Sequence, residues 1–217
     1  MMFYGVNNMI SIEEYKQNPC EALSIPYWKA TDIIIPDNVK IIHNKNFDDT
    51  LLEKYSDKQY FRLIHRLNYV PDFSNNDFTY KMLSKEKTNE VADMINASYL
   101  HTDVFVSADY IKCLTETKAY FPELWIGAFD NTKLVGSIIC DLDTKIGEGI
   151  IEWLQVLPEY RGKGIASVLV CKALNILKLN ADFVTVSGEC DNITNPESVY
   201  RKCGFVGNDI WHILTKR

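Results

Sequence analysis

Residues 152–166 of this chain read EWLQVLPEYRGKGIA, a strand-like segment that runs into a glycine-rich turn. Over residues 149–157, β-branched and aromatic side chains favour a strand, and Pro158 cannot donate to a ladder, so pairing should stop there. After Gly164, apolar residues recur at helical spacing as far as Leu177, while polar residues such as Lys172 fall on the opposite side. The sequence therefore predicts a helix that begins at the turn and packs on a sheet.

The turn has the features of an anion-binding site. It brings several backbone N–H groups to a helix N-terminus, and Gly162 and Gly164 lack the Cβ that would block close approach. Such a place favours an anion, most naturally a pyrophosphate. Lys163 is not followed by the Ser or Thr of a Walker A loop, and the third glycine of a dinucleotide fingerprint is absent. Both common phosphate loops are excluded, and a glycine turn without a ligand is the structural alternative.

The composition is that of an ordinary globular protein. The chain has 217 residues, 47% hydrophobic and 24% charged, enough for one large core or two small ones. Its net charge of −6 argues against nucleic acid as a partner. Six cysteines without C-x-x-C spacing and four scattered histidines suggest neither a disulfide framework nor a metal site. Because no apolar run is long enough to span a membrane and the N-terminus lacks a signal pattern, we expect a cytoplasmic protein with buried thiols.

The first third of the chain is the least regular part. Ser11 and Glu14 are spaced as a capping box. The expected elements are a helix over 10–17 and strands over 23–29, 33–35, 39–42 and 60–67. A polar stretch at 72–77 is the best candidate boundary. We therefore expect an N-terminal α+β region over residues 1–76, packed on a core domain over 77–217.

From residue 78 onward the elements follow one another regularly. Strands are expected over 78–84, 124–129, 134–142, 149–157 and 183–187, with one or two more over 205–214. Helices are expected over 86–98, 108–117, 165–177 and 196–202. The expected order is therefore β-α-α-β-β-β-α-β-α-β.

A second informative stretch, NPESVYRKCGF, covers residues 195–205. Asn195 is a good N-cap, Pro196 suits the first helical position, and Gly204 can take the left-handed conformation that ends a helix. A short helix with Tyr200 in its last turn is predicted, and simple packing of this tyrosine is the structural alternative.

Both stretches resemble motifs of the GNAT superfamily of N-acetyltransferases. Its motif A, V-x-P-x-x-[QR]-x-x-G-x-[GA], is matched by Val156, Pro158, Arg161, Gly164 and Ala166. Its motif B ends in L-Y-x-K-x-G-F, which residues 199–205 follow with valine in place of leucine. The resemblance covers residues 78–217 and implies an α+β fold with a mixed, mostly antiparallel central sheet and helices on both faces, the acyl-CoA acyltransferase fold.

The resemblance also implies where acetyl-CoA would bind. The backbone of Leu154 and Val156 would bind the pantetheine arm, and the N–H of Val156 would lie near the thioester oxygen. The amides that would hold the pyrophosphate are those of Arg161, Gly162, Lys163, Gly164, Ile165 and Ala166. No metal is implied.

One position departs from the family pattern. Many members have an asparagine seven residues before the motif B tyrosine, where this chain has Ile193 between Asn192 and Asn195. Whether either flanking asparagine contacts the cofactor is left open by the sequence, and Asn195 is taken as the candidate.

The chemistry implied is direct acetyl transfer to a primary amine. Tyr200 would be the general acid that protonates the departing thiolate; with ordinary pKa values of about 10 and about 8.5, that transfer is uphill by roughly 2 kcal/mol. Alternation along the strand places Glu148 and Glu152 on one face with Leu154 and Val156, and Glu152 is the nearer candidate for the base. Glu152 as a partner for a cationic acceptor, or as a solvated strand residue, is the alternative.

The acceptor and the role of the first third are the open parts of this interpretation. A small-molecule or peptide amine is expected as acceptor, with the protein a monomer or homodimer. The aromatic residues of the first third are core or pocket wall, and we expect this region to lie beside the cofactor cleft, with Tyr27 and Trp28 as candidates for the acceptor wall. The alternative function is a non-catalytic acyl-CoA-binding module with an N-terminal interaction domain.

Overall fold

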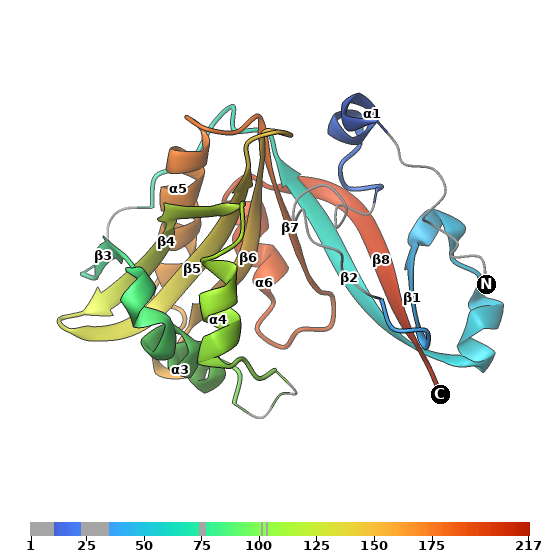
Figure 1. Cartoon of the computed structure of the whole chain (residues 1–217), viewed down its shortest axis with the longest axis horizontal. Helices are drawn as coiled ribbons and strands as arrows, with labels where there is room; N and C mark the ends of the chain where they lie inside the picture. The colour runs from blue at the N-terminus through green and yellow to red at the C-terminus, as the bar shows by residue number, and fades with distance from the viewer. Residues whose placement is uncertain (1–10, 23–34, 74–76, 101, 103) are drawn as a thin grey trace.

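The computed structural model describes residues 11–22, 35–73, 77–100, 102 and 104–217. These residues form an eight-stranded sheet in the order β1-β8-β2-β7-β6-β5-β4-β3 (Figure 1). The strand expected over 23–29, most of that expected over 33–35, and the side chains of Tyr27 and Trp28 lie outside the described residues.

Most expected elements are present. The strands are β1 (Val39–His43), β2 (Tyr55–His65), β3 (Thr79–Met82), β4 (Tyr120–Asp130), β5 (Lys133–Asp143), β6 (Glu148–Val156), β7 (Phe183–Glu189) and β8 (Val206–Lys216). The helices are α1 (Ile12–Gln17), α3 (Thr88–Ser98), α4 (Ala108–Leu114), α5 (Ile165–Leu177) and α6 (Pro196–Lys202). Short 3-10 turns occupy Asn44–Asn46, Asp49–Glu53, Lys85–Lys87 and Pro158–Tyr160.

Local signals set the helix ends where they were expected. The Ser11 hydroxyl accepts from the Glu14 amide, and the Glu14 carboxylate accepts from the Ser11 amide, so the predicted capping box is confirmed. The helix α5 begins directly after Gly164, and α6 begins and ends at the predicted residues. One difference is that α4 ends at Leu114, three residues early, where the Thr115 hydroxyl donates to the Lys112 carbonyl instead of the helix continuing.

The sheet is mixed and mostly antiparallel, as the fold class predicted. Only the pairing of β6 with β7 is parallel among the described strand pairs. The last strand is a single long one, because β8 is paired along its length by β2 on one side and by β1 on the other.

The N-terminal strands are part of this sheet. β2 lies between β7 and β8 and is antiparallel to both. The boundary expected near residue 76 therefore falls in the connection between two strands of one sheet.

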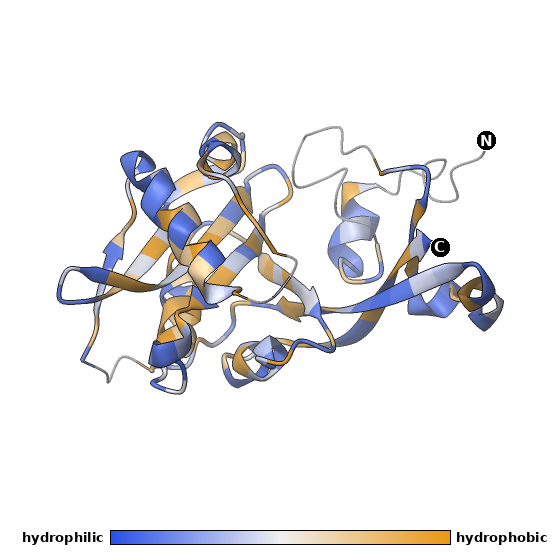
Figure 2. Ribbon diagram, turned by 90° about the horizontal axis from the view of Figure 1, so that it is seen from below, coloured by the Kyte–Doolittle hydropathy of each residue, from blue (hydrophilic) through white to orange (hydrophobic). Residues whose placement is uncertain are grey.

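Helices cover both faces of the sheet (Figure 2). On one face α5 lies so close that a Cβ on Gly149 would meet the Leu177 side chain at 2.6 Å, and one on Gly136 would meet Ile165 at 3.0 Å. On the other face Met94 of α3 lies 3.6 Å from the Ser137 hydroxyl. The buried apolar residues between these layers form one large core. Among the described residues, no helix has the length and apolar character needed to cross a membrane.

Candidate active site

The strands β6 and β7 separate partway along their length. Their parallel register runs from Glu148 opposite Phe183 to Ile151 opposite Val186 and ends there, although β6 continues to Val156 and β7 to Glu189 (Figure 1). Beyond that point β6 remains paired with β5 on its other side. The segment over residues 154–156, which the sequence assigned to the pantetheine arm, thus has one side that β7 no longer covers.

A β-bulge lies where the two strands part. Ile139 of β5 is opposite Trp153 and Cys140 is opposite Ile151, so Glu152 is the extra residue on β6. The bulge breaks the period-two alternation on which the sequence prediction relied. Cross-strand pairs share a face, so Glu148 lies on the face of Trp153, opposite the face of Leu154. The predicted shared face of Glu148 with Leu154 and Val156 was therefore wrong.

The two glutamates have different surroundings. Glu152 is half-buried at the bulge, and its carboxylate, together with burial and Asp141, raises the pKa of the nearby Cys140 thiol, burial being the largest cause. Glu148 is fully buried and accepts hydrogen bonds from Tyr15 and Thr185. Only Glu152 therefore stays a candidate base.

The glycine turn is open, as an anion site requires. Gly162 and Gly164 have φ of +76° and +78°, and a Cβ built on either would have no atom within 4 Å. The first bond of α5 runs from the Val168 amide to the Gly164 carbonyl, so the preceding amides at this helix start have no intrahelical acceptor. Left-handed glycines with open space above them, at the start of a 13-residue helix, fit a pyrophosphate.

The Arg161 side chain anchors this turn. Its Nε donates to the Val156 carbonyl at 3.2 Å, and its Nη2 donates to the Ser98 carbonyl at 2.7 Å. These bonds tie the turn to the end of β6 and to the last residue of α3. The guanidinium is thus directed to the protein, and Arg161 can serve an anion through its backbone.

Tyr200 lies in α6 in a nearly dry aromatic setting. It is 5% exposed, and its ring centroid lies 6.2 Å from that of Phe61 and 5.7 Å from that of Phe205. Burial raises its pKa, with smaller contributions from Tyr99, Cys140 and Cys203. The phenol is thus held in its protonated form at neutral pH, as a proton donor must be.

Asn195 has a structural task. It takes the left-handed conformation at the start of α6, and its Oδ1 accepts from the Ser198 amide at 3.4 Å. Asn192 accepts from the Thr194 amide and hydroxyl, and Ile193 is exposed. The capping prediction for Asn195 is confirmed, whereas its contact with a cofactor stays a prediction.

A second tyrosine, which the sequence interpretation missed, lies close by. The Tyr99 ring meets the Trp153 ring edge-on, with centroids 6.2 Å apart. Burial raises the pKa of Tyr99, and the nearby Arg161 partly opposes this. In the sequence, Tyr99 is only an aromatic residue directly after a predicted helix. Nothing in the sequence indicates that it lies near Tyr200.

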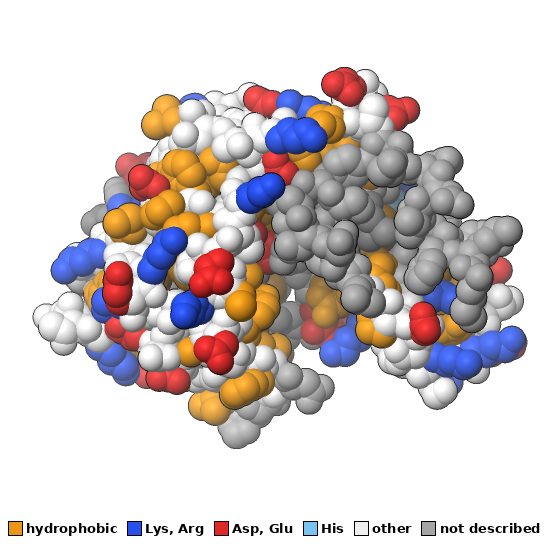
Figure 3. Space-filling model, in the orientation of Figure 1, with side chains coloured by type: hydrophobic (Ala, Val, Ile, Leu, Met, Phe, Trp, Pro, Cys, Tyr) orange, Lys and Arg blue, Asp and Glu red, His pale blue; other side chains and the backbone are white. Residues whose placement is uncertain are grey.

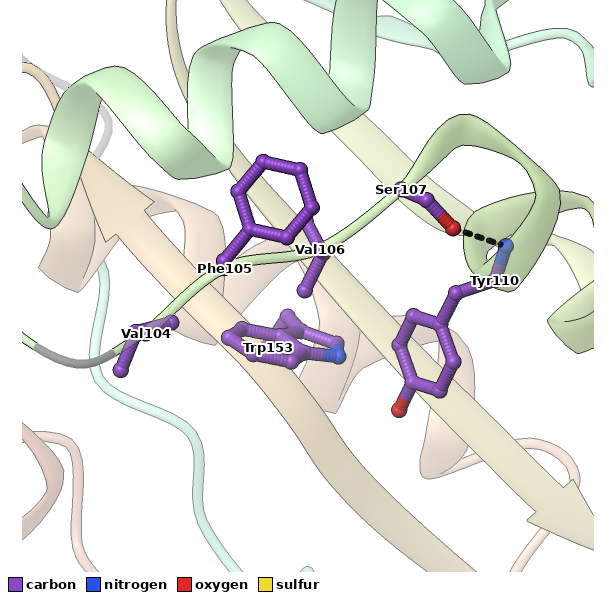
Figure 4. A pocket seen from close by; sticks show the side chains of 6 residues that line it. All are labelled: Val104, Phe105, Val106, Ser107, Tyr110 and Trp153. Carbon is purple, nitrogen blue, oxygen red and sulfur yellow. Dashed lines mark hydrogen bonds between the residues drawn. The ribbon is translucent and has the colours of Figure 1, made fainter.

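A pocket opens beside these residues. It has a volume of about 460 Å³ and lies between the segment that follows α3 and the strand β6 (Figure 4). The lining residues are Val104, Phe105, Val106, Ser107, Tyr110 and Trp153. The Ser107 hydroxyl accepts from the Tyr110 amide at 3.1 Å and so caps α4. No charged side chain belongs to this lining. Elsewhere in the described residues, no group of three or more His, Cys, Asp or Glu side chains could hold a metal ion.

The arrangement defines an acyltransferase fold, and its candidate site lies at the point where β6 and β7 separate. A sequence model described as the acetyltransferase (GNAT) family matches residues 80–205. The chain belongs to this GNAT acetyltransferase family.

Two curated relatives are N-alpha-acetyltransferases. N-alpha-acetyltransferase 30 of Schizosaccharomyces pombe is 35% identical over 89 residues, which are 39% of this chain and 59% of that protein. N-alpha-acetyltransferase MAK3 of Arabidopsis thaliana is 34% identical over 89 residues, 40% of this chain and 46% of that protein. The chain thus spans about half the length of the curated relatives it matches.

Solved structures share the fold at low sequence identity. A GCN5-related N-acetyltransferase from Sphaerobacter thermophilus matches with a TM-score of 0.67 and 16% identity over 83% of this chain and 61% of its own. The NatC complex bound to Gag peptide and CoA contains a chain that matches with a TM-score of 0.53 and 22% identity, over 65% of this chain and 99% of its own. A functionally unknown protein from Staphylococcus epidermidis covers 97% of this chain and 82% of its own, with a TM-score of 0.59 and 15% identity.

We predict that protonation of His65, which packs against Phe205 just after α6, makes the folded protein less stable in acid. This residue is buried, its ring lies 5.2 Å from that of Phe205, and its Nδ1 accepts from the Leu67 amide. Burial lowers the pKa of His65, so below about pH 6.5 the unfolded chain binds a proton more readily than the folded one. The free energy of unfolding should therefore fall as the pH drops from 7 to 5. In urea titrations, His65→Asn, whose Oδ1 can accept from Leu67 without titrating, should show a smaller fall, and equal falls would contradict this role.

Proposed function

We propose that the chain is an N-acetyltransferase that moves an acetyl group from acetyl-CoA directly to a primary amine. The observation that carries the proposal is the separation of β6 from β7 beside an open turn with two left-handed glycines. Glu152 lies at the bulge where the strands part, and Tyr99 is close enough to Tyr200 to affect its pKa. A non-catalytic acyl-CoA-binding module would need the same turn but would have no need of the buried tyrosine.

The residues present fit the two polar parts of acetyl-CoA. The amides of residues 161–166 would hold the pyrophosphate, and the backbone of Leu154 and Val156 would hold the pantetheine arm. When bound there, acetyl-CoA supplies the acetyl group as an activated thioester. The Val156 amide is the proposed donor to the acetyl carbonyl oxygen, and Asn195 is a proposed further contact.

Proton transfer is assigned to side chains on the two sides of this separation. Glu152, half-buried at the bulge, is the proposed acceptor of the proton from the amine. Tyr200 is the proposed donor to the departing sulfur. Its raised pKa keeps it protonated but makes the transfer more costly than for an ordinary phenol, which leaves Tyr99 as the second candidate donor.

The acceptor is proposed to be the α-amine of a peptide, with its first side chains in the pocket beside Trp153. Both curated relatives are named N-alpha-acetyltransferases, and the NatC structure is described as bound to a peptide and CoA. The lining of this pocket favours apolar side chains. On the described part of the face shown in Figure 3, acidic and basic side chains are interspersed among apolar ones. A screen of peptides and small amines, followed by free thiol release, tests the acceptor class.

The expected place of the N-terminal region in this site stays a prediction. Phe61 of β2 packs against Tyr200, so this region does build one side of the tyrosine's setting. The described lining of the acceptor pocket, by contrast, comes from residues 104–153.

The charge of the turn can be tested with two substitutions of equal size. Gly164→Asp places a carboxylate where the pyrophosphate should lie, and Gly164→Asn places a neutral amide of the same shape in the same left-handed backbone. Calorimetry should show acetyl-CoA binding nearly abolished by Asp and weakened less by Asn, with circular dichroism unchanged. Equal affinity of the two variants for acetyl-CoA would show that the pyrophosphate does not bind at this turn.

The role of Tyr200 predicts a loss of rate without a loss of binding. Tyr200→Phe keeps the packing against Phe61 and removes the proton, so kcat should fall about 10²-fold or more with little change in cofactor affinity. Tyr99→Phe is the parallel variant, because it removes the other nearby phenol. A large fall in kcat for Tyr99→Phe alone would transfer the donor role to Tyr99.

The apolar acceptor pocket predicts an effect on KM. Phe105 is 79% exposed at the rim of this pocket, so Phe105→Ala should leave folding intact. We expect the KM for peptides with an apolar first residue to rise about fivefold or more, since roughly 1–3 kcal/mol is typical for apolar contacts of this kind, while kcat changes little. Leu179→Ala is the control, because Leu179 is 85% exposed and outside the pocket. An unchanged KM would place the acceptor elsewhere.

A further inference from the structure

A buried polar cluster lies where β6 and β7 still pair. Glu148 is 0% exposed, and the Thr185 hydroxyl of the neighbouring strand donates to it at 2.6 Å. Arg62 of β2 approaches the same carboxylate at 3.5 Å and donates to the Thr185 hydroxyl at 3.3 Å. The Tyr15 hydroxyl of α1 donates to Glu148 at 2.8 Å. The Glu148 carboxylate therefore links β2, β6, β7 and α1. It does so at the end of β6 and β7 where these two strands are still paired, here called their closed end.

The segment that carries Tyr15 is seated on the sheet by side chains of other strands. The Arg62 Nε donates to the Pro19 carbonyl at 3.1 Å, and the Trp211 Nε1 donates to the Cys20 carbonyl at 2.9 Å. Tyr15 is fully buried and packs with Phe183, the first residue of β7. These contacts fix the phenol of Tyr15 over the first residues of both β6 and β7.

Burial makes this carboxylate dependent on its partners. Burial raises the pKa of Glu148, whereas Arg62, Thr185 and Tyr15 lower it and the more distant Asp143 raises it. A buried carboxylate that loses a hydrogen-bond donor must shift, protonate or draw in water. A shift of the Glu148 side chain or the entry of water would change the spacing of β6 and β7 at their closed end.

We propose that Tyr15 is a positioning residue for the cofactor cleft, acting through Glu148 on the separation of β6 and β7. The inference rests on the proposed function for its effect on acetyl-CoA. Val156 lies five residues beyond Ile151, about 16 Å along the strand. A change of about 5° in the direction of β6 at Ile151 would therefore move Val156 by about 1.4 Å. The N-terminal helix thus sets the width of the cleft from the end at which β6 and β7 are still paired.

The test compares two variants of α1. Tyr15→Phe removes the hydrogen bond to Glu148, together with the one that Arg62 donates to the phenol, and keeps the ring, whereas Ser11→Ala removes the capping box and leaves the cluster intact. For Tyr15→Phe we expect the Kd and KM for acetyl-CoA to rise about fivefold or more, with kcat at saturating acetyl-CoA within about twofold. For Ser11→Ala we expect a lower Tm with unchanged Kd and KM. A fall in Tm for Tyr15→Phe with an unchanged Kd would overturn the proposal.

Hydrogen exchange of the protein alone provides a readout that does not depend on acetyl-CoA. In Tyr15→Phe, amides over residues 152–156 and 187–189 should exchange faster than in Ser11→Ala. If the unaltered protein fails to bind acetyl-CoA, the proposed function is wrong, and this comparison alone decides the positioning role. Equal exchange in the two variants would overturn it. Should Tyr15→Phe fail to fold, Thr185→Val removes another of the donors to Glu148 with little change of shape and is held to the same outcomes.

Discussion

The partial pairing of β6 with β7 is the constraint on which the site depends. β6 keeps its ladder with β5 from Glu148 to Val156 but its ladder with β7 only as far as Ile151. The extra residue at Glu152 lies where the second ladder ends, and a bulge both bends a strand and increases its twist. β6 can therefore turn away from β7 without losing β5. The backbone beyond the bulge leads directly into the open glycine turn at the start of α5.

The N-terminal region completes the other side of this opening. β2 fills the place between β7 and β8, and Phe61 reaches Tyr200 from it. The fit is close, because a Cβ on Gly188 would lie 2.5 Å from the Phe61 ring. Removing β2 would leave β8 without its longer partner and α6 without one of the two rings that pack on its tyrosine. The strands β1 and β2 thus belong to the same sheet that carries the family motifs.

Burial raises the pKa of both Tyr200 and Glu148, but the two side chains have different surroundings. Tyr200 is surrounded by aromatic rings on the face of α6, so the raised pKa simply keeps its proton in place. Glu148 lies on the opposite face, where Arg62, Thr185 and Tyr15 compensate a buried carboxylate. The first arrangement suits a proton donor, and the second suits a structural joint, because a compensated charge resists displacement.

The sequence alone determined the parts of this protein that depend on neighbours along the chain. The glycine turn, the start of α5, the capping box of α1 and both ends of α6 follow from backbone conformation and local hydrogen bonds. The family motifs, from which the fold class was predicted, are likewise short stretches of residues that are neighbours along the chain. The tertiary structure decided which segments meet: the bulge that moved Glu148 to the other face, the insertion of β2, and the approach of Tyr99, Trp153 and Phe61 to the site. Residue spacing could not predict these contacts, because strand register and bulges arise from pairing between strands distant in sequence.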